Sequence, residues 1–259
     1  MTLRVALLHL ELSGGPESDN LMALESAIGI AAIHGAHWIV TPETAVQGYF
    51  FAKKAGTPNI PVQPSAALQN ILQLAKKENL TIFLGCGEQD AMTGTYYNSC
   101  LVIGPDGEIV GRHRKLRTHG DAESWAAKGE AVETIDCQDV KAGVLVCADS
   151  WYVHYAQALK EKGAQAIIVP AAWPPGVCGP EDCWERCSAA TGLPVWVCNQ
   201  TGNQEDMDFS HAQSVVVSGG QTQLSYKGLQ QAVLLFDWDE AEKKLLSTDF
   251  KVIQVGRKR

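Results

Sequence analysis

Apolar positions along this chain follow two alternating patterns. Short, nearly continuous apolar runs predict strands, and segments with apolar residues three or four positions apart predict helices. The first helix carries Leu21, Leu24 and Ile28 on one face, with capping side chains at Ser18-Asp19-Asn20 and a stop at Gly35. The pattern predicts strands at 3–9, 37–40, 80–86 and 98–103, and helices at 18–35 and 65–78. This alternation is typical of an α/β protein.

The second half of the chain is richer in predicted strands. A turn at Pro105-Asp106-Gly107 leads into the first of them. Pro180 opens a late helix, because proline is well tolerated in the first helical turn. Strands are predicted at 108–115, from about 141 and from 195, and helices at 151–162 and 180–190. Because late strands outnumber late helices, we expect mixed sheets.

Length and composition favour one globular domain. The chain has 259 residues, 46% hydrophobic and 19% charged, and no linker-like stretch, so residues 1–259 are predicted to form a single domain. Its formal net charge of −8 argues against a nucleic-acid partner, because phosphate binding needs clustered Lys and Arg. Such clusters occur only at 112–117 and 257–259.

No stretch of the sequence predicts membrane insertion or secretion. No apolar run approaches the roughly 20 residues that a membrane-spanning helix needs. The run at 3–9 is followed by no small-residue cleavage site, so it is predicted as a strand and not as a signal peptide. With eight cysteines and no secretory signal, we expect free thiols and a cytoplasmic location.

The segment at 143–151 carries the main chemical signal. It places Cys147 where an apolar strand ends and a polar, helix-starting sequence begins. The N–H groups and dipole of a helix N-terminus favour a thiolate and can bind a developing oxyanion. Cys147 is therefore a candidate nucleophile, and a buried core cysteine is the alternative.

Two further polar residues end predicted strands. Glu43 follows the apolar run at 38–40, and Lys115 closes the strand at 108–115. Alone, Glu43 could cap a helix and Lys115 could belong to a solvated basic run. With Cys147 they supply a base, a cation and a nucleophile, and ligand sites in α/β folds lie at the carboxyl ends of strands. Together the three residues predict nucleophilic catalysis.

At these residues the chain resembles the carbon–nitrogen hydrolase family, also called the nitrilase superfamily. The matching segments are 42–49, 112–116 and 143–152. Later segments resemble the strands of that family at 163–170, 195–202, 210–218 and 231–237. The resemblance implies a four-layer α-β-β-α sandwich with mixed sheets. It also implies a second glutamate shortly after the lysine, which is Glu123 in this chain.

The resemblance implies cysteine-dependent hydrolysis of a non-peptide C–N bond through a thioester. Glu43 would take the proton of Cys147 and later activate water. Lys115 would stay cationic and, with the backbone N–H of Ala148, stabilise the oxyanion. Glu123 would hold Lys115 or the substrate amine, and no metal ion or organic cofactor is required. The candidate substrate-binding residues are Tyr49, Ala148, Trp151 and Trp173. Trp151 and Trp173 could equally be core or interface aromatic residues.

The residues after the cysteine favour an amide over a nitrile. Cys147, Asp149, Trp151 and Tyr152 resemble the pattern of N-carbamoyl amidases, whereas nitrilases usually carry Trp-Glu after the cysteine. We therefore expect a small carboxamide or N-carbamoyl substrate and release of ammonia. A nitrilase and a non-catalytic binding protein of the same fold are the alternatives. The chain departs from the family pattern at Ala148, 153–154 and 191–194, so the substrate is not identified.

The resemblance also implies a homodimer or a larger even-numbered assembly. The predicted helix at 151–162 carries Trp151, Tyr152 and Tyr155 on a broad aromatic face, and aromatic residues are enriched in interface cores. A helix that faces its own core would look similar.

The remaining cysteines raise the question of a metal site. Cys183 and Cys187 are four positions apart and would share a helix face. With Cys178, however, they match no familiar zinc pattern. We therefore expect core or loop thiols and no metal.

Overall fold

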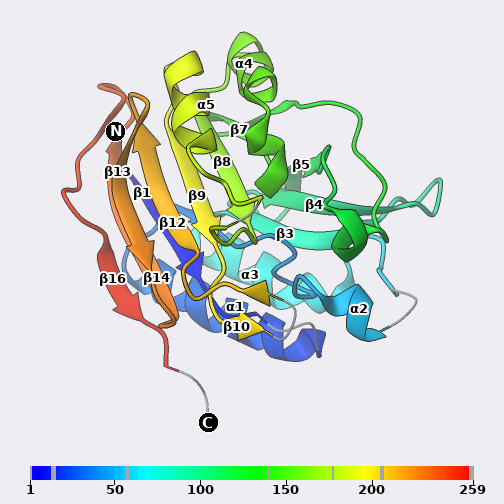
Figure 1. Ribbon diagram of the computed structural model, residues 1–259. Helices are drawn as coiled ribbons and strands as arrows, with labels where there is room; N and C mark the ends of the chain where they lie inside the picture. Colours follow the sequence, from blue (N-terminus) through cyan, green and yellow to red (C-terminus); the bar gives the residue numbers. More distant parts are fainter. Residues whose placement is uncertain are drawn as a thin grey trace.

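Two β-sheets form the centre of the molecule, and the longer helices lie outside them (Figure 1). The structure, a computed structural model, describes residues 2–12, 16–55, 59–138, 140–176, 178–204 and 207–256. The helices are α1 Glu17–Ile33, α2 Phe51–Ala55, α3 Gln69–Glu78, α4 Val153–Glu161 and α5 Cys183–Thr191, with 3₁₀ turns η1 Ala66–Leu68, η2 Gly120–Glu123 and η3 Cys147–Trp151. The strands are β1 Thr2–His9, β2 Trp38–Val40, β3 Thr81–Gln89, β4 Tyr96–Ile103, β5 Ile109–Arg114, β6 Thr134–Cys137, β7 Val140–Val144, β8 Ala166–Ala171, β9 Val195–Asn199, β10 Asn203–Gln204, β11 Met207–Asp208, β12 Gln213–Ser218, β13 Gln221–Lys227, β14 Ala232–Asp239, β15 Lys244–Leu245 and β16 Lys251–Gln254.

Both large sheets are mixed, as predicted. The eight-stranded sheet has the order β15-β14-β1-β2-β3-β4-β5, with β16 also paired to β14. Its centre, β1 to β3, is parallel, and its flanking strands are antiparallel. The six-stranded sheet has the order β13-β12-β9-β8-β7-β6, again with a parallel centre of β7 to β9. Strands β10 and β11 pair as a separate two-stranded sheet.

The two large sheets pack face to face between two layers of helices. Strands β1, β2 and β3 contact β8 and β9 of the other sheet. Trp38 and Trp196 meet across this interface, with ring centroids 5.9 Å apart. Helix α1, with α3 beside it, covers one outer face, and α4 and α5 cover the other (Figure 1). The predicted four-layer α-β-β-α sandwich is confirmed.

Burial on both faces explains the continuous apolar runs in the sequence. Every residue of β8 is buried, and so are the residues of β2 and β9. A strand that is covered by helices on one side and by a second sheet on the other has no solvent-facing residues, so its sequence does not alternate. The predicted strands at 3–9, 37–40 and 98–103 lie within one or two residues of the observed ones.

The N-terminus of α1 differs from the prediction. The helix begins at Glu17 behind Pro16, and no side chain caps it by a hydrogen bond. Asn20, expected in the cap, is buried and its amide donates to the Val46 carbonyl at 3.2 Å. Glu17 and Asp19 still lie in the first turn, where negative charge complements the helix dipole. The predicted apolar face of this helix is buried as expected.

The late helix begins three residues later than predicted. Pro180 does not open it, because Glu181 adopts a left-handed φ of +47° that interrupts the helical path. Helix α5 starts at Cys183, whose N–H bonds the Pro180 carbonyl at 3.0 Å. Similarly, Trp151 ends a 3₁₀ turn, and α4 starts at Val153.

Several strands were not predicted from the sequence. β6, β13 and β16 lie at or near sheet edges, and β13 is exposed at five of its seven positions. Edge strands face solvent on more than one side, so their sequences need few apolar residues. The polar run in β13 therefore gave no strand signal.

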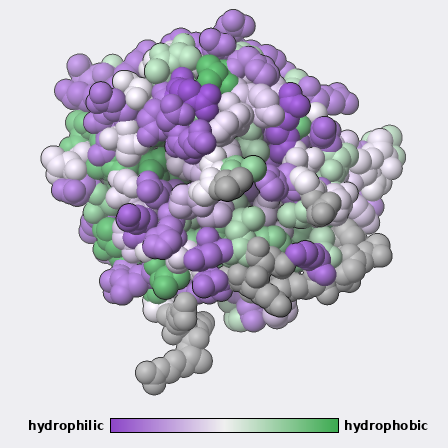
Figure 2. All heavy atoms as spheres, in the orientation of Figure 1, coloured by the Kyte–Doolittle hydropathy of each residue, from purple (hydrophilic) through white to green (hydrophobic). Residues whose placement is uncertain are grey.

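The surface is largely polar, in keeping with the charge of the chain. Figure 2 shows one face on which hydrophilic residues predominate and apolar residues form small, separate patches. Within the described residues, no helix is long and apolar enough to cross a membrane.

The carboxyl ends of β2, β5, β7 and β8 converge on one side of the sandwich. The backbone N–H of Glu43, which follows β2, bonds the carbonyl of Ala171 at the end of β8 with N and O 3.4 Å apart. This hydrogen bond joins the two sheets at the point where their strand ends meet. Side chains that follow these strands are therefore brought together.

Candidate active site

Glu43 lies at the centre of the convergence point and is only 1% exposed. Its Oε1 accepts hydrogen bonds from Lys115 Nζ at 2.6 Å and from Asn98 Nδ2 at 2.8 Å. Its Oε2 accepts one from the backbone N–H of Ala172 at 3.1 Å. Three donors, two that follow β5 and β8 and one within β4, thus fix the orientation of this carboxyl group.

Lys115 is fully buried and bridges two carboxylates. It follows the last residue of β5, and its Nζ donates to Glu43 Oε1 and to Glu123 Oε1, each at 2.6 Å. Glu123 also accepts from the hydroxyl of Tyr49 at 2.8 Å and from the backbone N–H of His119 at 3.1 Å. A buried cation needs such paired carboxylates, because burial without partners would expel its proton.

Cys147 begins the turn η3 with a left-handed backbone, at φ +49°. This conformation is uncommon for a residue with a side chain and is held by the surroundings. Ser150 Oγ donates to the Cys147 carbonyl at 2.7 Å and closes the turn. The Glu43 carboxyl and the backbone N–H of Ala172 lie near enough to the thiol to act on its pKa in opposite directions, the first raising it and the second lowering it.

Burial and neighbouring charges set the protonation of the three groups. Burial raises the pKa of Glu43 to about 7, against the opposing effect of Lys115. Burial opposes the charge of Lys115, but the carboxylates of Glu43 and Glu123 prevail and hold its pKa well above the usual range. Burial and the Glu43 carboxylate raise the pKa of Cys147 well above that of a free thiol.

The raised pKa of Cys147 contradicts one expectation from the sequence. The sequence suggested that a helix N-terminus would favour a thiolate at Cys147, but the turn that follows is a five-residue 3₁₀ turn and the sulfur is buried against a carboxylate. The resting group is therefore a thiol. The neighbouring Glu43 carboxyl, with a pKa near neutrality, is suited to accept a proton from such a thiol.

Asp149 connects the lysine loop to the cysteine turn. It is fully buried, and its Oδ1 accepts from the backbone N–H groups of Leu116 and Arg117 at 3.0 and 2.8 Å. Its Oδ2 accepts from the Val146 N–H at 3.1 Å and from His113 Nε2 at 2.9 Å. One carboxylate thus holds the residues beside Lys115 and Cys147 at a fixed separation.

We expect Asp149→Asn to lower both stability and turnover. The amide N–H of asparagine would then lie opposite the Val146 N–H or the His113 ring nitrogen, so that donors face each other and stay unpaired. Unpaired buried groups should lower the free energy of unfolding by about 3 kcal/mol. Turnover should fall about 10- to 100-fold, because a misplacement of about 1 Å can cost that much. Denaturant unfolding and kcat/KM measure the two effects. Asp136→Asn, at an 81% exposed side chain paired with Lys141, is the control and should change neither.

Cys147 opens onto a cavity of about 170 Å³. Three of the candidate substrate-binding residues, Tyr49, Ala148 and Trp173, line it with the nucleophile. Trp151 does not line this space but packs on Trp173, with ring centroids 6.2 Å apart, and lines a second cavity beside it. All four candidates therefore lie at or next to the cavity of Cys147, and Tyr49 also bonds Glu123.

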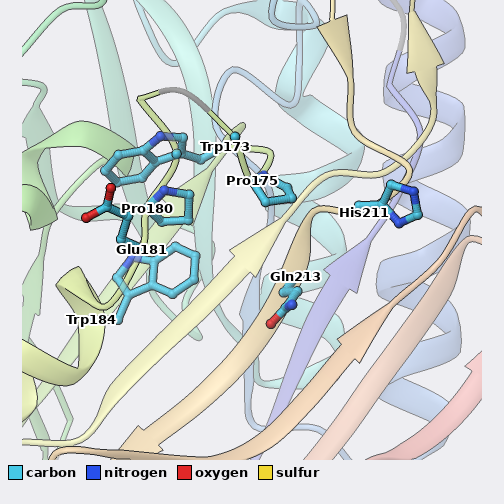
Figure 3. Close-up of a pocket in the computed structure, with 9 residues that line it drawn as sticks. Trp173, Pro175, Pro180, Glu181, Trp184, His211 and Gln213 are labelled. Atoms are coloured by element: carbon cyan, nitrogen blue, oxygen red, sulfur yellow. The ribbon is translucent and has the colours of Figure 1, made fainter.

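Trp173 lines both this cavity and a third pocket of about 210 Å³, which Figure 3 shows. Its backbone N–H and carbonyl bond the side chain of Asn199 at 2.9 and 2.8 Å. Its indole N–H bonds the Cys178 carbonyl at 2.7 Å. These three bonds fix the ring as a wall of the site.

Several site residues were not predicted from the sequence as part of the chemistry. Asn98 and Ala172 contact Glu43, and Asp149 positions the two loops. The signal for Asp149 was present, because an acidic residue in an otherwise apolar strand end is costly unless it is paired. Asn98 lies within a strand, where the sequence does not show which side chain it faces.

The described residues contain no group of three or more His, Cys, Asp or Glu side chains placed to hold a metal ion. Cys183 and Cys187 are both buried on α5, where Cys187 Sγ bonds the Ser150 carbonyl at 3.1 Å. Burial raises the pKa of Cys187 to about 11 and that of Cys183 to about 12. Both are core thiols behind the cysteine turn.

Comparison with solved structures shows the same fold in known proteins. The structure of Nit3 from Saccharomyces cerevisiae, a member of the nitrilase superfamily, superposes with a TM-score of 0.79 at 24% identity, over 91% of this chain and 89% of that one. An amidase from Nesterenkonia sp. superposes with a TM-score of 0.81 at 21% identity, over 92% and 90% of the two chains.

Sequence comparison extends over most of the chain. The chain is similar to omega-amidase NIT2 of Mus musculus, at 28% identity over 92% of this chain and 89% of that protein. It is similar to citrullinase of Francisella tularensis, at 28% identity over 80% of this chain and 77% of that protein. The family model of the carbon-nitrogen hydrolases matches residues 4–227. With the fold, this match confirms the resemblance first seen in the sequence, and the chain belongs to the carbon-nitrogen hydrolase family of enzymes.

Proposed function

We propose that this enzyme hydrolyses the C–N bond of a small carboxamide or N-carbamoyl compound through a thioester on Cys147. The observation that carries the proposal is the buried cation of Lys115, held between Glu43 and Glu123 beside the thiol. A structural ion pair would need only one carboxylate, and burying three charges beside a cysteine is costly without a function. The printed activities of the relatives, an omega-amidase and a citrullinase, support an amide or ureido substrate.

Acylation begins with transfer of the Cys147 proton to Glu43. The sulfur attacks the carbonyl carbon, and the C=O electron pair moves to oxygen as an oxyanion. Lys115 and the N–H of Ala148 stabilise this charge, an effect commonly worth about 3 kcal/mol per donor. Glu43 returns the proton to the leaving nitrogen, the C–N bond breaks, and ammonia or an amine departs.

Deacylation reverses these roles with water as the nucleophile. Glu43 takes a proton from water, the resulting hydroxide attacks the thioester carbon, and a second oxyanion forms at the same place. Collapse breaks the C–S bond, and the sulfur recovers a proton from Glu43. Glu123 acts through Lys115, because it bonds Nζ directly and keeps the cation in position. In both steps, residues of this chain and water supply and accept every proton.

Ammonia release tests the proposal. Amides, N-carbamoyl compounds and nitriles of matched carbon skeleton should be compared, with mass spectrometry of the enzyme to detect a covalent adduct on Cys147. We expect release from amides or carbamoyl compounds and little from nitriles. Preferential turnover of nitriles would support the nitrilase alternative. No release and no adduct from any class would leave a non-catalytic binding protein.

We further propose that residues 1–259 act as one domain in the cytoplasm and need no metal or organic cofactor. One hydrophobic cluster runs through both large sheets, which supports a single folding unit. All eight cysteines are free thiols, which suits a reducing compartment.

We also propose a homodimer that uses the aromatic face of α4. Tyr152 is 36% exposed at the start of this helix, and its ring lies beside those of His154 and Tyr155. Tyr155→Glu should weaken association, because it buries a charge in the contact, and should reduce activity. Light scattering at micromolar concentration measures the first effect, with Lys160→Glu on the same helix as the control. A fully active wild-type monomer would contradict the proposal.

A further inference from the structure

Three fully buried polar side chains form a chain of hydrogen bonds that ends at Trp173. His9 is the last residue of β1, Ser214 lies in β12 and Asn199 is the last residue of β9. Strand β1 belongs to one large sheet and β9 and β12 belong to the other, so the chain of bonds crosses between the sheets (Figure 1). Buried polar groups are costly unless they are hydrogen-bonded. The partners of these three side chains therefore show what the group does.

The last acceptor sets the direction of every hydrogen bond in this chain. Burial lowers the pKa of His9 to about 4, so the ring is neutral and carries one proton. Its Nε2 lies 3.3 Å from the carbonyl oxygen of Gly228, which can only accept, so we assign the proton to Nε2. Nδ1 then accepts the hydroxyl proton of Ser214 at 2.9 Å, a shorter contact than the 3.3 Å from that hydroxyl to the Asn199 carbonyl. The Ser214 oxygen in turn accepts the backbone N–H of Asn199 at 2.9 Å.

The side chain of Asn199 holds the residues that follow β8. Its Oδ1 accepts the backbone N–H of Trp173 at 2.9 Å, and its Nδ2 donates to the Trp173 carbonyl at 2.8 Å. Ala171, the last residue of β8, lies opposite Asn199 in the sheet, and its carbonyl accepts the N–H of Gln200 at 3.3 Å. The Asn199 amide thus replaces a strand partner for Trp173, two residues beyond the end of β8.

Ala172 lies between these two fixed residues, and its backbone N–H is a donor of the site. This N–H bonds Glu43 Oε2 at 3.1 Å and lies near the thiol of Cys147. Because the peptide unit is planar, the direction of the N–H depends on where the neighbouring residues 171 and 173 are held. The sheet holds residue 171, and the side chain of Asn199 holds residue 173. A displacement of Asn199 would therefore turn this donor away from the carboxyl group.

Resting on the proposed function, we propose that Asn199 is a positioning residue, which directs the Ala172 N–H at the carboxyl group of Glu43. Ser214 and His9 hold Asn199 in place. An N–H donated to a carboxylate favours its charged form, and this is the form that takes the proton of the nucleophile. A buried chain whose hydrogen bonds are all made is rigid, and such support keeps a site within about 0.5 Å of its working geometry.

Asn199→Ala tests the positioning role, because it removes the side-chain amide without adding a charge. We expect kcat for ammonia release from a primary amide to fall about 10- to 100-fold, since a misplacement of about 1 Å can cost that much. The acid limb of the kcat/KM profile should also move to higher pH, because a carboxyl group that loses a donated N–H is harder to ionise. The ionisable groups around Glu43 are unchanged in this variant, namely Tyr49, Lys115, Glu123 and Cys147.

Milder variants separate a change of position from a loss of stability. Ser214→Ala removes the acceptor of the Asn199 N–H and should lower kcat less than Asn199→Ala does, with the pH shift in the same direction. Ser188→Ala on α5 is the matched control, because it also removes a buried hydroxyl that accepts a backbone N–H, that of Gly220 at 3.2 Å. It should lower the free energy of unfolding to a similar extent and leave kcat and the pH profile unchanged. His9→Asn, which keeps a hydrogen-bonding atom near Nδ1, should retain more activity than His9→Leu.

Alkylation of Cys147 reports the same geometry without turnover. The rate at which iodoacetamide modifies Cys147, followed by mass spectrometry at fixed pH, should fall in Asn199→Ala. Burial and the Glu43 carboxylate raise the pKa of this thiol, and the variant withdraws the Ala172 N–H that opposes them. Should Asn199→Ala fail to fold, Ser214→Ala carries the test by the same measurements.

The outcomes separate this inference from the proposed function. An unchanged kcat, pH profile and alkylation rate in folded Asn199→Ala, or in Ser214→Ala where the first variant does not fold, would overturn the inference and leave the hydrolase intact. Equal losses in Ser188→Ala and Ser214→Ala would also overturn it, because they would show a general effect of stability. Absence of ammonia from every substrate, with slower alkylation of Cys147 in the variants, would overturn the proposed function and leave the positioning role of Asn199.

Discussion

Replacement of Cys147 by alanine is expected to reduce kcat by about 10⁴-fold or more, because it removes the atom that forms the thioester. The fold should persist, since the change deletes one sulfur atom from a turn that Ser150 and Asp149 hold by their own hydrogen bonds. Ammonia release measures the loss, and circular dichroism with thermal unfolding checks the fold.

Cys147→Ser should be nearly as inactive. The Glu43 carboxyl, with a pKa raised to about 7, is far too weak a base to ionise a hydroxyl group. Cys137→Ala, which removes a buried thiol from β6 far from the convergence point, is the matched control and should retain turnover. Substantial activity in either Cys147 variant would contradict a covalent mechanism.

The sequence brought the three candidate catalytic residues to one edge of the sandwich for a physical reason. Glu43, Lys115 and Cys147 each follow an apolar strand, and the carboxyl ends of parallel strands in a sheet meet at one edge. Hydrophobic runs predict where strands end, so they also predict which residues follow the strands and lie at this edge. The resemblance to a family then added Glu123, whose contact with Lys115 no local pattern indicates.

The supporting groups could not be predicted in the same way. Asn98 lies within β4, and its amide reaches Glu43 only because β4 lies two strands from β2 in the sheet, a pairing that the sequence does not state. The left-handed backbone of Cys147 depends on the bonds made by Asp149 and Ser150. Tertiary contacts, not local preference, determine these features.

The protonation state of Cys147 differs most from what the sequence predicted. A strand-to-helix junction suggested an ionised cysteine, yet the pKa of Cys147 is raised because the sulfur is buried and faces a carboxylate. Burial depends on what packs around the junction, here residues such as Tyr49 and Trp173, which line the same cavity as Cys147. The reaction that we propose therefore needs a base at the moment of attack, and the Glu43 carboxyl, whose charge acts on the pKa of the thiol, is placed to serve as that base.

Lys115 should tolerate no substitution, even by another cation. Its Nζ lies 2.6 Å from each of two carboxylate oxygens in a fully buried position, so both distance and size are fixed. Arginine is longer and carries its charge over a planar fork, which cannot occupy the place of a compact ammonium group. We expect Lys115→Arg to reduce kcat about 100-fold or more, since loss of one oxyanion donor costs about 10²- to 10³-fold.

Removal of the charge tests whether Lys115 acts on the reaction or only on the fold. Lys115→Met leaves the carboxylates of Glu43 and Glu123 facing each other without a cation, so the free energy of unfolding should fall together with turnover. The double variant Lys115→Met with Glu123→Gln removes one charge of each sign. It should recover part of the lost stability. It should not recover turnover, because the oxyanion still lacks its cation. Lys162→Arg, on an exposed pair with Glu133, is the control for the lysine-to-arginine change. A near-normal rate in Lys115→Arg would show instead that any positive charge near the thiol suffices, and would contradict the requirement for a compact ammonium group at this point.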